Sequence, residues 1–571
     1  MKEMLAFLAK RILVCFDGRF RLIVIAILVG LLGGCASVLL NYGLRHAADW
    51  LATYRDHWYA VFFSALGAAG AVIVLRSVIR DSDGHGVPEV IYAISRRKGM
   101  LRLRASLSRL IACLLTIASG GSAGPEAPVV VTGASIGSNI ARLFCLDARQ
   151  RIIAVCCGTS AAIAAIFNAP VTGIIFTMEV ILEDWTPVSV VPIAIASVVG
   201  TEVSRLLQGN QIPFEPRSFQ VSGPDLAACV GLSLVAAVSA VLLVRCVRLM
   251  HSRVEKAPGT AWLHAAWGGL MVGIIGLSLP NALGEGYECV SSIIEGRYPA
   301  GFLLVGMGLL AKIAATSLTM GSGGSGGIFA PCLVIGSFTG LLFQRGLAAV
   351  FQDIPWAGEG YYSLLGMAGV LSAVLKAPMT GVFLIAEITG GYEVLVSVVL
   401  VSVLSSMLSQ LVEPFSFYQH ELIQRGALLR RRTDSHVLSE LNVLDLLEQD
   451  CRVVRSDLPL RNFVEIVKQS HRNHFVVEDP KTGHFLGMIH LDDVRMYLFD
   501  TTLYDLIVIA DIMDREGERV SPDQPLMDVM RQFEKTYSWN LPVVYNDRFL
   551  GLISKASLLD YYRKQLISEE K

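Results

Sequence analysis

Residues 158–182 of the chain read GTSAAIAAIFNAPVTGIIFTMEVIL, and residues 366–390, GMAGVLSAVLKAPMTGVFLIAEITG, align with them without a gap. The alignment pairs Ala169-Pro170 with Ala377-Pro378, Gly173 with Gly381, and Glu179 with Glu387. Internal self-similarity of this kind indicates two duplicated halves that share one local structure. The paired glutamates are interpreted as residues that cap or pin helices.

A second pair of matching stretches precedes the first. GSAGPEAPVVVTGASIG, from Gly121, aligns with GSGGSGGIFAPCLVIGSFTG, from Gly321, so that Gly124 pairs with Gly327. Glu126 takes the place that Phe329 has in the second half. A carboxylate at membrane depth costs on the order of 2.5 to 3.5 kcal/mol on insertion scales, so its surroundings must compensate it.

The composition indicates a protein that crosses a membrane several times. Of 571 residues, 53% are hydrophobic and 17% are charged, and apolar runs broken by Gly and Pro recur from Leu22 to about Leu411. The net charge of -1 offers no basic face for a nucleic acid. The eleven cysteines lie mostly in apolar runs without a CxxC pair, which favours packing over a metal or disulfide role.

The broken hydrophobic segments are typical of a transport site. A helix that starts inside a membrane presents free N–H groups and a partial positive charge, which attract an anion without a buried cation. A third break, SDGHGVPEVIYAI from Ser82, has the same glycine and proline pattern ahead of a helix. Three such helix starts directed at one point suit a small dehydrated anion.

The composition changes after Gly426. Two units with the same order of strands, helices and turns follow, one containing HFVVED and FLGMI and the other LPVVYND and FLGLI. They resemble a tandem pair of CBS domains, a cytoplasmic regulatory module. The expected organisation is a basic amphipathic N-terminal helix (1–21), a transmembrane anion-transport domain (22–426), a linker (427–444), and two CBS domains (445–505 and 506–571).

Together the three breaks and a late tyrosine identify a family. The chain resembles the CLC chloride channels and transporters, whose usual motifs GSGIP, G(K/R)EGP and GIFAP read here as GHGVP (84–88), GPEAP (124–128) and GIFAP (327–331), with Tyr418 in FSFYQHELIQRG. The resemblance implies a mainly helical polytopic membrane protein of two inverted repeats with broken helices, followed by the α/β CBS pair. It also implies a homodimer in which each subunit has its own anion path.

The resemblance assigns roles to particular residues. Glu126 is the expected gate, since its carboxylate can occupy an anion position and leave it on protonation. The backbone N–H groups of Ile328 and Phe329 and the Tyr418 hydroxyl are expected to coordinate chloride. The full set expected to line the anion site is His85, Gly86, Val87, Gly124, Ala127, Gly327, Ile328, Phe329 and Tyr418.

Three residues depart from the family pattern. Pro125 replaces the usual Arg or Lys, which removes one charge and one N–H donor beside the gate. His85 stands where a serine often contacts the anion, or it points away and leaves that contact to the backbone. Val180 stands where many exchangers have the glutamate that relays protons on the cytoplasmic side, although Glu183, one helical turn after Glu179, is a substitute.

Simpler interpretations remain beside these. Glu126 also fits a first-turn carboxylate, Tyr418 an interfacial aromatic residue, and His85 a capped or solvent-facing histidine. The CBS pair fits a dimerising scaffold or an adenine-nucleotide site. For the nucleotide, each copy keeps half of the usual pattern, with Asp493 in the first and Ser554 in the second.

The expected function is therefore transport of chloride, gated by protons at Glu126, with channel-like conduction favoured over chloride/proton exchange. A CBS-bearing cation transporter would need several acidic residues along its pore, and an enzyme would need motifs such as HExxH or GxSxG, which do not occur. No cofactor or metal is expected. The partners expected are a second copy, lipid, chloride and protons, in the cell (inner) membrane with the N-terminus and CBS domains in the cytoplasm.

Overall fold

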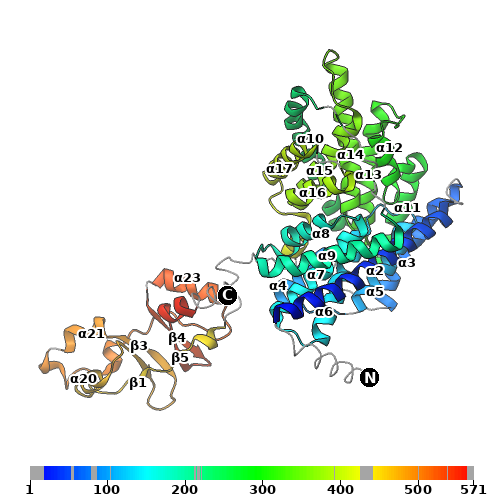
Figure 1. Cartoon of the computed structure of the whole chain (residues 1–571). Coiled ribbons are helices and arrows are strands. Elements are labelled where there is room, and N and C mark those ends of the chain that lie inside the picture. The colour runs from blue at the N-terminus through cyan, green and yellow to red at the C-terminus, as the bar shows by residue number, and fades with distance from the viewer. Residues whose placement is uncertain are drawn as a thin grey trace. The chain divides into compact units, whose positions relative to one another are not determined.

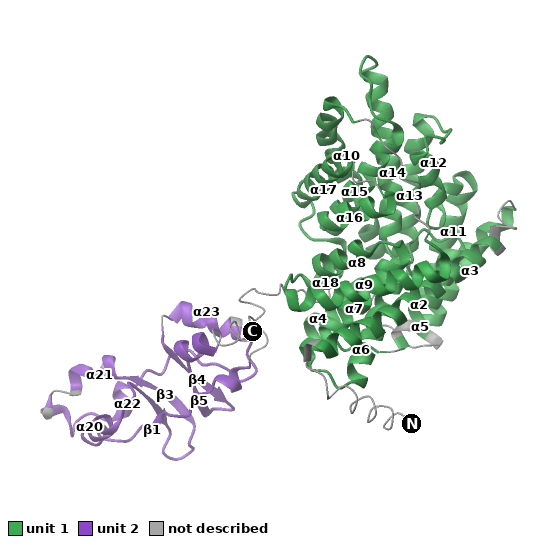
Figure 2. Cartoon of the chain, viewed as in Figure 1, with its two compact units in different colours: residues 1–428 green, residues 429–571 purple. Residues whose placement is uncertain are grey.

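The structure, a computed structural model, describes the chain except for residues 1–17, 53–56, 79–85, 103, 211–213, 215–218, 220, 391–392, 425–441, 499, 537 and 562–571. The chain forms two compact units, residues 1–428 and residues 429–571 (Figure 2). Most of the expected N-terminal helix (1–21) and of the expected linker (427–444) lies outside the described residues.

Every element of secondary structure that is described in unit 1 is a helix (Figure 1). The helices of its first half are α2 (Gly18–Ala52), η1 (Trp58–Ala60), α3 (Val61–Ile73), η2 (Val74–Val78), α4 (Val87–Arg96), α5 (Arg104–Ala118), α6 (Glu126–Leu143), α7 (Ala148–Phe167), α8 (Pro170–Phe176), η3 (Thr177–Leu182) and α9 (Pro187–Gln208). Those of the second half are α10 (Gly223–Lys256), α11 (Ala261–Ser278), η4 (Pro280–Ala282), α12 (Tyr287–Ile294), α13 (Phe302–Gly321), α14 (Phe329–Val350), α15 (Glu359–Leu375), α16 (Pro378–Thr389), α17 (Leu395–Gln410) and α18 (Phe417–Gln424).

Unit 1 has the helices of a membrane protein. Among the described residues, eight helices are long and apolar enough to cross a membrane. They are α2, α3 with η2, α7, α9, α10, α11, α13 and α14. Shorter apolar helices, among them α8 and α16, lie between them, as expected for helices that are broken within the membrane.

The aligned stretches of the two halves adopt the same backbone. α7 ends at Phe167 and is followed by Asn168 at φ 53°, while α15 ends at Leu375 and is followed by Lys376 at φ 58°. In both halves one alanine then leads into the proline that begins the next helix, α8 or α16. Proline at the first helical position loses no hydrogen bond, so both helices begin where the sequence dictates.

Two glutamates hold the halves together. The Glu387 carboxylate, on α16, accepts hydrogen bonds of 2.7 to 2.9 Å from two backbone N–H groups at the start of α8 and from the Thr172 hydroxyl. The Glu179 carboxylate, in η3, accepts the equivalent three bonds from the start of α16 and the Thr380 hydroxyl, at 2.7 to 3.1 Å. Each half therefore caps a helix of the other, which confirms the interpretation of these glutamates as residues that pin helices.

Unit 2 contains two small sheets. In the first copy, β1 (Arg452–Arg455) pairs in parallel with β2 (His474–Glu478), and β2 pairs antiparallel with β3 (Phe485–His490). In the second copy, β4 (Asn540–Tyr545) pairs antiparallel with β5 (Arg548–Ser554). The helical segments are η5 (Val443–Leu446), α20 (Leu460–Gln469), α21 (Leu491–Leu498), η6 (Thr501–Leu503), α22 (Ile509–Ile512), α23 (Leu526–Thr536) and residues 555–561.

The second copy repeats the order of elements in the first, but its first strand is shorter. Its counterpart of β1 is a single parallel bridge between Val520 and Val543. Helices α20 and α23 occupy equivalent places and bury apolar residues such as Phe463 and Phe533 against their sheets. The mainly helical unit 1 and the α/β unit 2 agree with the fold class expected from the sequence.

Removal of one cross-half cap should weaken unit 1. Glu387→Ala deletes three acceptor bonds at the start of α8, and loss of such a cap costs about 0.5–2 kcal/mol. We expect the midpoint of thermal unfolding in detergent to fall by a few degrees, with a similar fall for Glu179→Ala. Glu393→Ala, at an exposed position, is the control. Equal midpoints for Glu387→Ala and the control would contradict the pinning role.

Candidate functional site

Three helix starts meet at one place in unit 1. α6 begins at Glu126, α14 begins at Phe329, and α4 begins after Gly86, whose φ is 73°. A Cβ atom on Gly86 would lie 2.9 Å from the Cβ atom of Ala127, so the starts of α4 and α6 are in contact. The breaks that the sequence analysis singled out are thus brought together.

The two matched glycines pair with each other. The N–H of Gly124 donates to the carbonyl of Gly327 at 2.9 Å, and the N–H of Gly327 donates to the carbonyl of Gly124 at 2.7 Å. An antiparallel pair between equivalent residues means that a local twofold axis passes between them. The two halves are therefore inverted relative to each other at this point.

The Glu126 side chain lies across this pair. Its Oε1 atom accepts a hydrogen bond of 2.6 Å from the N–H of Phe329, the first residue of α14. Glu126 is 1% exposed, and its Oε2 atom has no hydrogen-bond partner. The positive end of α14 stabilises the negative charge of the carboxylate, which offsets the cost of a buried acid.

The Phe329 ring is fixed by the first half. It stacks on the ring of Phe167 at a centroid distance of 5.0 Å and meets the ring of Phe176 edge-on at 6.1 Å. Phe329 has no exposed surface. This packing holds the N–H of Phe329 in place for the carboxylate.

A cavity of about 360 Å³ adjoins the carboxylate site. Five residues expected to line the anion site, namely Gly86, Ala127, Gly327, Ile328 and Tyr418, line this cavity. The Tyr418 hydroxyl is buried and has no hydrogen-bond partner. A buried hydroxyl without a partner is rare and marks a place where a ligand can accept a hydrogen bond.

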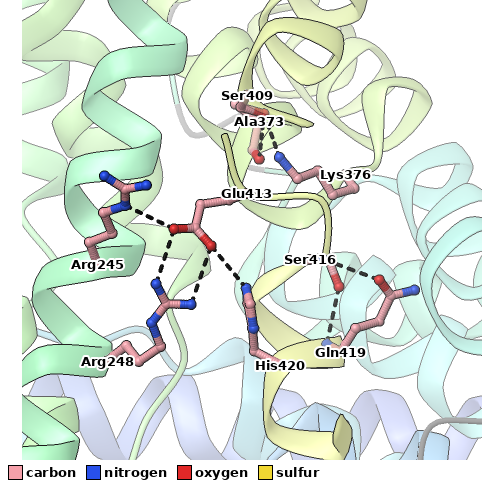
Figure 3. A network of polar contacts seen from close by, with 9 residues as sticks. All are labelled: Arg245, Arg248, Ala373, Lys376, Ser409, Glu413, Ser416, Gln419 and His420. Carbon is pink, nitrogen blue, oxygen red and sulfur yellow. Dashed lines mark hydrogen bonds and ion pairs between the residues drawn. The ribbon is translucent and has the colours of Figure 1, made fainter. Parts of the chain in front are cut away.

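A charged network positions the helix that carries Tyr418 (Figure 3). The Glu413 carboxylate, just before α18, accepts hydrogen bonds from Arg245 at 2.9 Å and from Arg248 at 3.0 and 3.2 Å, both on α10. His420, on α18, places its Nε2 atom 3.3 Å from the same carboxylate. These contacts tie α18 to α10, and Arg248 and His420 also line the cavity.

The position at which many exchangers of the resembled family have a relay glutamate is apolar in this chain. Val180 lies within η3, a π-helix, and is 9% exposed. The expectation that Glu183 lies one helical turn after Glu179 is wrong, because η3 ends at Leu182 and Glu183 follows in the left-handed conformation at φ 52°. Its exposed carboxylate accepts a 3.4 Å hydrogen bond from Gln419, the residue after Tyr418.

The structure places the remaining predicted residues as follows. Val87 is the first residue of α4 and is fully buried. His85 lies outside the described residues, and so does the Asp493 side chain. Within the described part of the chain, no group of three His, Cys, Asp or Glu side chains is placed to hold a metal ion.

In unit 2, the predicted Ser554 lines a cavity of about 470 Å³ together with Arg472, Trp539, Asn540 and Asp560. Its hydroxyl donates to the Glu448 carboxylate at 2.5 Å. Glu448 also forms an ion pair of 3.2 Å with Arg472. The cavity therefore combines a cation, an aromatic side chain and an acid.

The first copy has two histidines where the second has Asn540 and Ser554. His474 faces His490 across β2 and β3, as Asn540 faces Ser554 across β4 and β5. The Nδ1 atoms of the histidines lie 2.8 Å apart. Burial, and then the neighbouring His490, lowers the pKa of His474.

Lys312 is a fully buried lysine that no motif of the sequence indicates. Lys312, on α13, has no exposed surface, and its Nζ atom donates to the carbonyl oxygens of Gly284 at 2.7 Å and Ala282 at 3.3 Å. A single lysine within an apolar run of spanning length was the available signal, because an intramembrane charge is retained for a purpose.

Comparison with known proteins agrees with this geometry. Residues 67–410 match the family described as voltage gated chloride channel, and residues 509–564 match the CBS domain. A putative chloride channel protein ClcB-like from Ralstonia nicotianae is 28% identical over 429 residues, which span 72% of this chain and 98% of the relative.

Two solved structures share the fold. A slow cyanobacterial Cl−/H+ antiporter has a TM-score of 0.65 at 21% identity and covers 73% of this chain and 100% of its own. A eukaryotic CLC transporter has a TM-score of 0.64 at 17% identity and covers 94% of this chain and 98% of its own. The family expected from the motifs is thereby confirmed: the chain belongs to the voltage gated chloride channel (CLC) family, and unit 2 is its CBS region.

Proposed function

We propose that the protein conducts chloride passively across a membrane and that protonation of Glu126 opens the path. The observation that carries this proposal is the Glu126 carboxylate at the start of α14, next to a cavity that contains the unpartnered Tyr418 hydroxyl. An acid in this place occupies the position that an anion would take. The relative from Ralstonia nicotianae is named as a putative chloride channel, in line with the proposal.

The gate works through the charge of one side chain. While Glu126 is ionised, its carboxylate accepts a hydrogen bond from the N–H of Phe329, so this donor is not available to other anions. A proton neutralises the carboxylate, which removes its attraction to the positive end of α14. Chloride then takes the vacated place, with the N–H of Phe329 and the Tyr418 hydroxyl as donors. When the proton leaves, the carboxylate returns and displaces the anion.

Channel-like conduction is favoured by Val180. This buried valine cannot carry a proton, so the described residues provide no inner relay at the usual position. Chloride is then able to move without a fixed number of protons. His85 and Pro125 bear on the selectivity for chloride over other anions, since each changes a donor near the path.

Chloride/proton exchange is the second candidate, and Glu183 favours it. The Glu183 carboxylate is exposed and is held by Gln419, the neighbour of Tyr418. An exposed acid that contacts the helix bearing Tyr418 is suited to collect protons and pass them towards the site through water. The cyanobacterial structure with the same fold is described as a Cl−/H+ antiporter.

The assembly and orientation follow from the family and the charge pattern. We propose a homodimer in the inner membrane, in which each subunit has its own path. The basic residues near the N-terminus favour a cytoplasmic location for that end and, with it, for the CBS pair.

We also propose that the CBS pair binds an adenine nucleotide in the cavity around Ser554. Arg472 offers a cation for the phosphates, Trp539, 70% exposed, offers a face for the base, and Asp560 offers an acceptor for the ribose. In the first copy the equivalent position is filled by the His474–His490 pair. One nucleotide per chain is therefore expected.

Chloride flux tests the main proposal. In proteoliposomes, the wild type should release chloride down its gradient, faster as the pH falls, without moving protons uphill. Glu126→Gln mimics the neutral gate and should make the flux fast and independent of pH. Simultaneous recording of chloride and pH checks both expectations. Proton uptake driven by a chloride gradient would contradict the channel and support exchange, and loss of that uptake in Glu183→Gln would identify its inner acid.

Gly124→Ala should expel the gate without changing its charge. A Cβ atom on Gly124 would lie 2.0 Å from the Oε2 atom of Glu126, and the three nearest atoms to it all belong to that carboxyl group. The flexible carboxylate must move away from the start of α14, so flux at high pH should rise towards that of Glu126→Gln. Gly306→Ala, on α13, meets no atom within 4 Å and is the control. A wild-type pH profile for Gly124→Ala would show that the carboxylate does not block the path.

Calorimetry tests the nucleotide site. The full-length protein should give heat of binding with ATP, ADP or AMP, and Arg472→Ala should weaken that binding at least tenfold. Arg461→Ala removes an exposed arginine that pairs with Asp505 elsewhere in unit 2 and should bind like the wild type. An absence of heat with all three nucleotides would leave the CBS pair as a scaffold.

A further inference from the structure

Two threonines of α13 hold the stretch of chain that carries the gate. The N–H of Ser122 donates to the Thr319 hydroxyl at 3.0 Å, and the Ser122 hydroxyl shares a hydrogen bond of 3.0 Å with the hydroxyl of Thr316. All three residues are buried. A backbone N–H that is buried in a membrane protein has no water to replace a lost acceptor. The Thr319 hydroxyl therefore fixes the backbone just before Glu126.

The second half holds its own stretch in the same way. Ser325, the counterpart of Ser122, donates its N–H to the hydroxyl of Thr116, on α5, at 3.2 Å. Thr116 is in turn the counterpart of Thr319, because TIASGGSAGPE, from Thr116, and TMGSGGSGGIF, from Thr319, align without a gap. Each half thus holds the stretch of the other. The gate and the N–H group that it contacts are both fixed from the opposite half.

A loop adds a second hold on the stretch that carries the gate. The N–H of Gly284, in the loop of residues 279–286 between α11 and α12, donates to the carbonyl of Gly120 at 3.2 Å. Leu283 of the loop also lies over Gly120, at 3.8 Å from where its Cβ atom would be. Lys312 fixes this loop through two of its carbonyl groups, as described above.

Lys312, Thr316 and Thr319 form one face of α13. Residues spaced by four and three are neighbours on the surface of a helix. We call these three residues the gate support. They hold the gate-bearing stretch at Ser122 directly and at Gly120 through the loop.

We propose that the gate support positions Glu126 for its contact with the start of α14 and thereby stabilises the closed gate. This inference rests on the proposed function, in which protonation of Glu126 opens the path. The three residues act on the backbone that precedes Glu126, so they are positioning residues.

Loss of the support should favour the open gate. The ionised Glu126 carboxylate is held in the closed position by the 2.6 Å hydrogen bond from the N–H of Phe329, and its Oε2 atom has no partner. A hydrogen bond weakens steeply when its length and angle depart from the optimum, so a shift of the backbone at Ser122 weakens this contact. The open gate has already given up the contact and loses nothing by the shift. Opening then needs less acid.

Thr319→Val tests the proposal, because valine has nearly the shape of threonine but no hydroxyl group. The pH profile of chloride flux is measured in proteoliposomes with equal pH on both sides. Its midpoint should move towards alkaline pH by about half a unit to one unit, since a hydrogen bond changes an equilibrium by about threefold to tenfold. A wild-type midpoint in Thr319→Val would overturn the proposal.

Two further variants separate positioning from a general loss of packing. Thr319→Ser keeps the hydroxyl group and should restore the wild-type midpoint. Thr201→Val removes another buried hydroxyl, which donates to the Ser197 carbonyl within α9, and should keep the wild-type profile. An alkaline shift of the same size in Thr201→Val would overturn the proposal.

Lys312→Met tests the hold through the loop. It leaves the loop carbonyl groups without their donor and should move the midpoint in the same direction as Thr319→Val. An acid shift would contradict the stabilisation of the closed gate.

A double variant shows whether the gate support acts through the gate. In Glu126→Gln, whose flux should not respond to pH, Thr319→Val should change nothing further. A flux that Thr319→Val alters in that background would overturn the proposal, because Thr319 would then act on the path itself. A wild type whose flux ignores pH would instead contradict the proposed function, so the two failures are distinguishable.

Discussion

The hydrogen bond between the Glu126 carboxylate and the N–H of Phe329 is the contact on which the site depends. It joins the first helix turn of one half to the first helix turn of the other. The two turns reach each other because Gly124 and Gly327 pair directly across the local axis. A side chain on either glycine would displace the carboxylate, since a Cβ atom would lie 2.0 or 2.2 Å from its oxygens. Because Gly124 and Gly327 have no side chains, the Glu126 carboxylate can occupy the space between them.

Three glutamates contact helix starts of the opposite half, with two different consequences. Glu179 and Glu387 are equivalent residues, and each accepts three hydrogen bonds from the other half, so both are fully used as caps. Glu126 has Phe329 as its equivalent, and one of its oxygens is buried without a partner. A carboxylate whose two oxygens both accept hydrogen bonds stays in place. A carboxylate with one unpartnered oxygen loses fewer hydrogen bonds when it leaves, so its departure costs less free energy. Duplication of the halves produced two equivalent helix starts that face each other. The difference between Glu126 and Phe329 at these starts gave the site a group that can take up a proton.

Much of this arrangement was predictable from the repeat. Aligned residues such as Asn168 and Lys376 share a left-handed backbone, and aligned glycines meet at the axis. The position of Glu183 was not predictable from α-helical spacing, because the π-helix before it ends one residue earlier. The link from Glu413 to Arg245 and Arg248 was equally hidden, since it joins residues far apart in the chain and leaves no periodic pattern.

The gate motif of this chain lacks the Arg or Lys that usually precedes the gating glutamate in the family. With Pro125 in the motif, the positive end of α14 is the nearest support for the Glu126 carboxylate, and a helix end is worth less than a full charge. The fully buried Lys312 is directed to backbone carbonyls instead, where it fixes the loop between α11 and α12. The place of the gate therefore depends on α13, which holds the gate-bearing stretch at Ser122 and the loop between α11 and α12 at Lys312, and not on the motif alone.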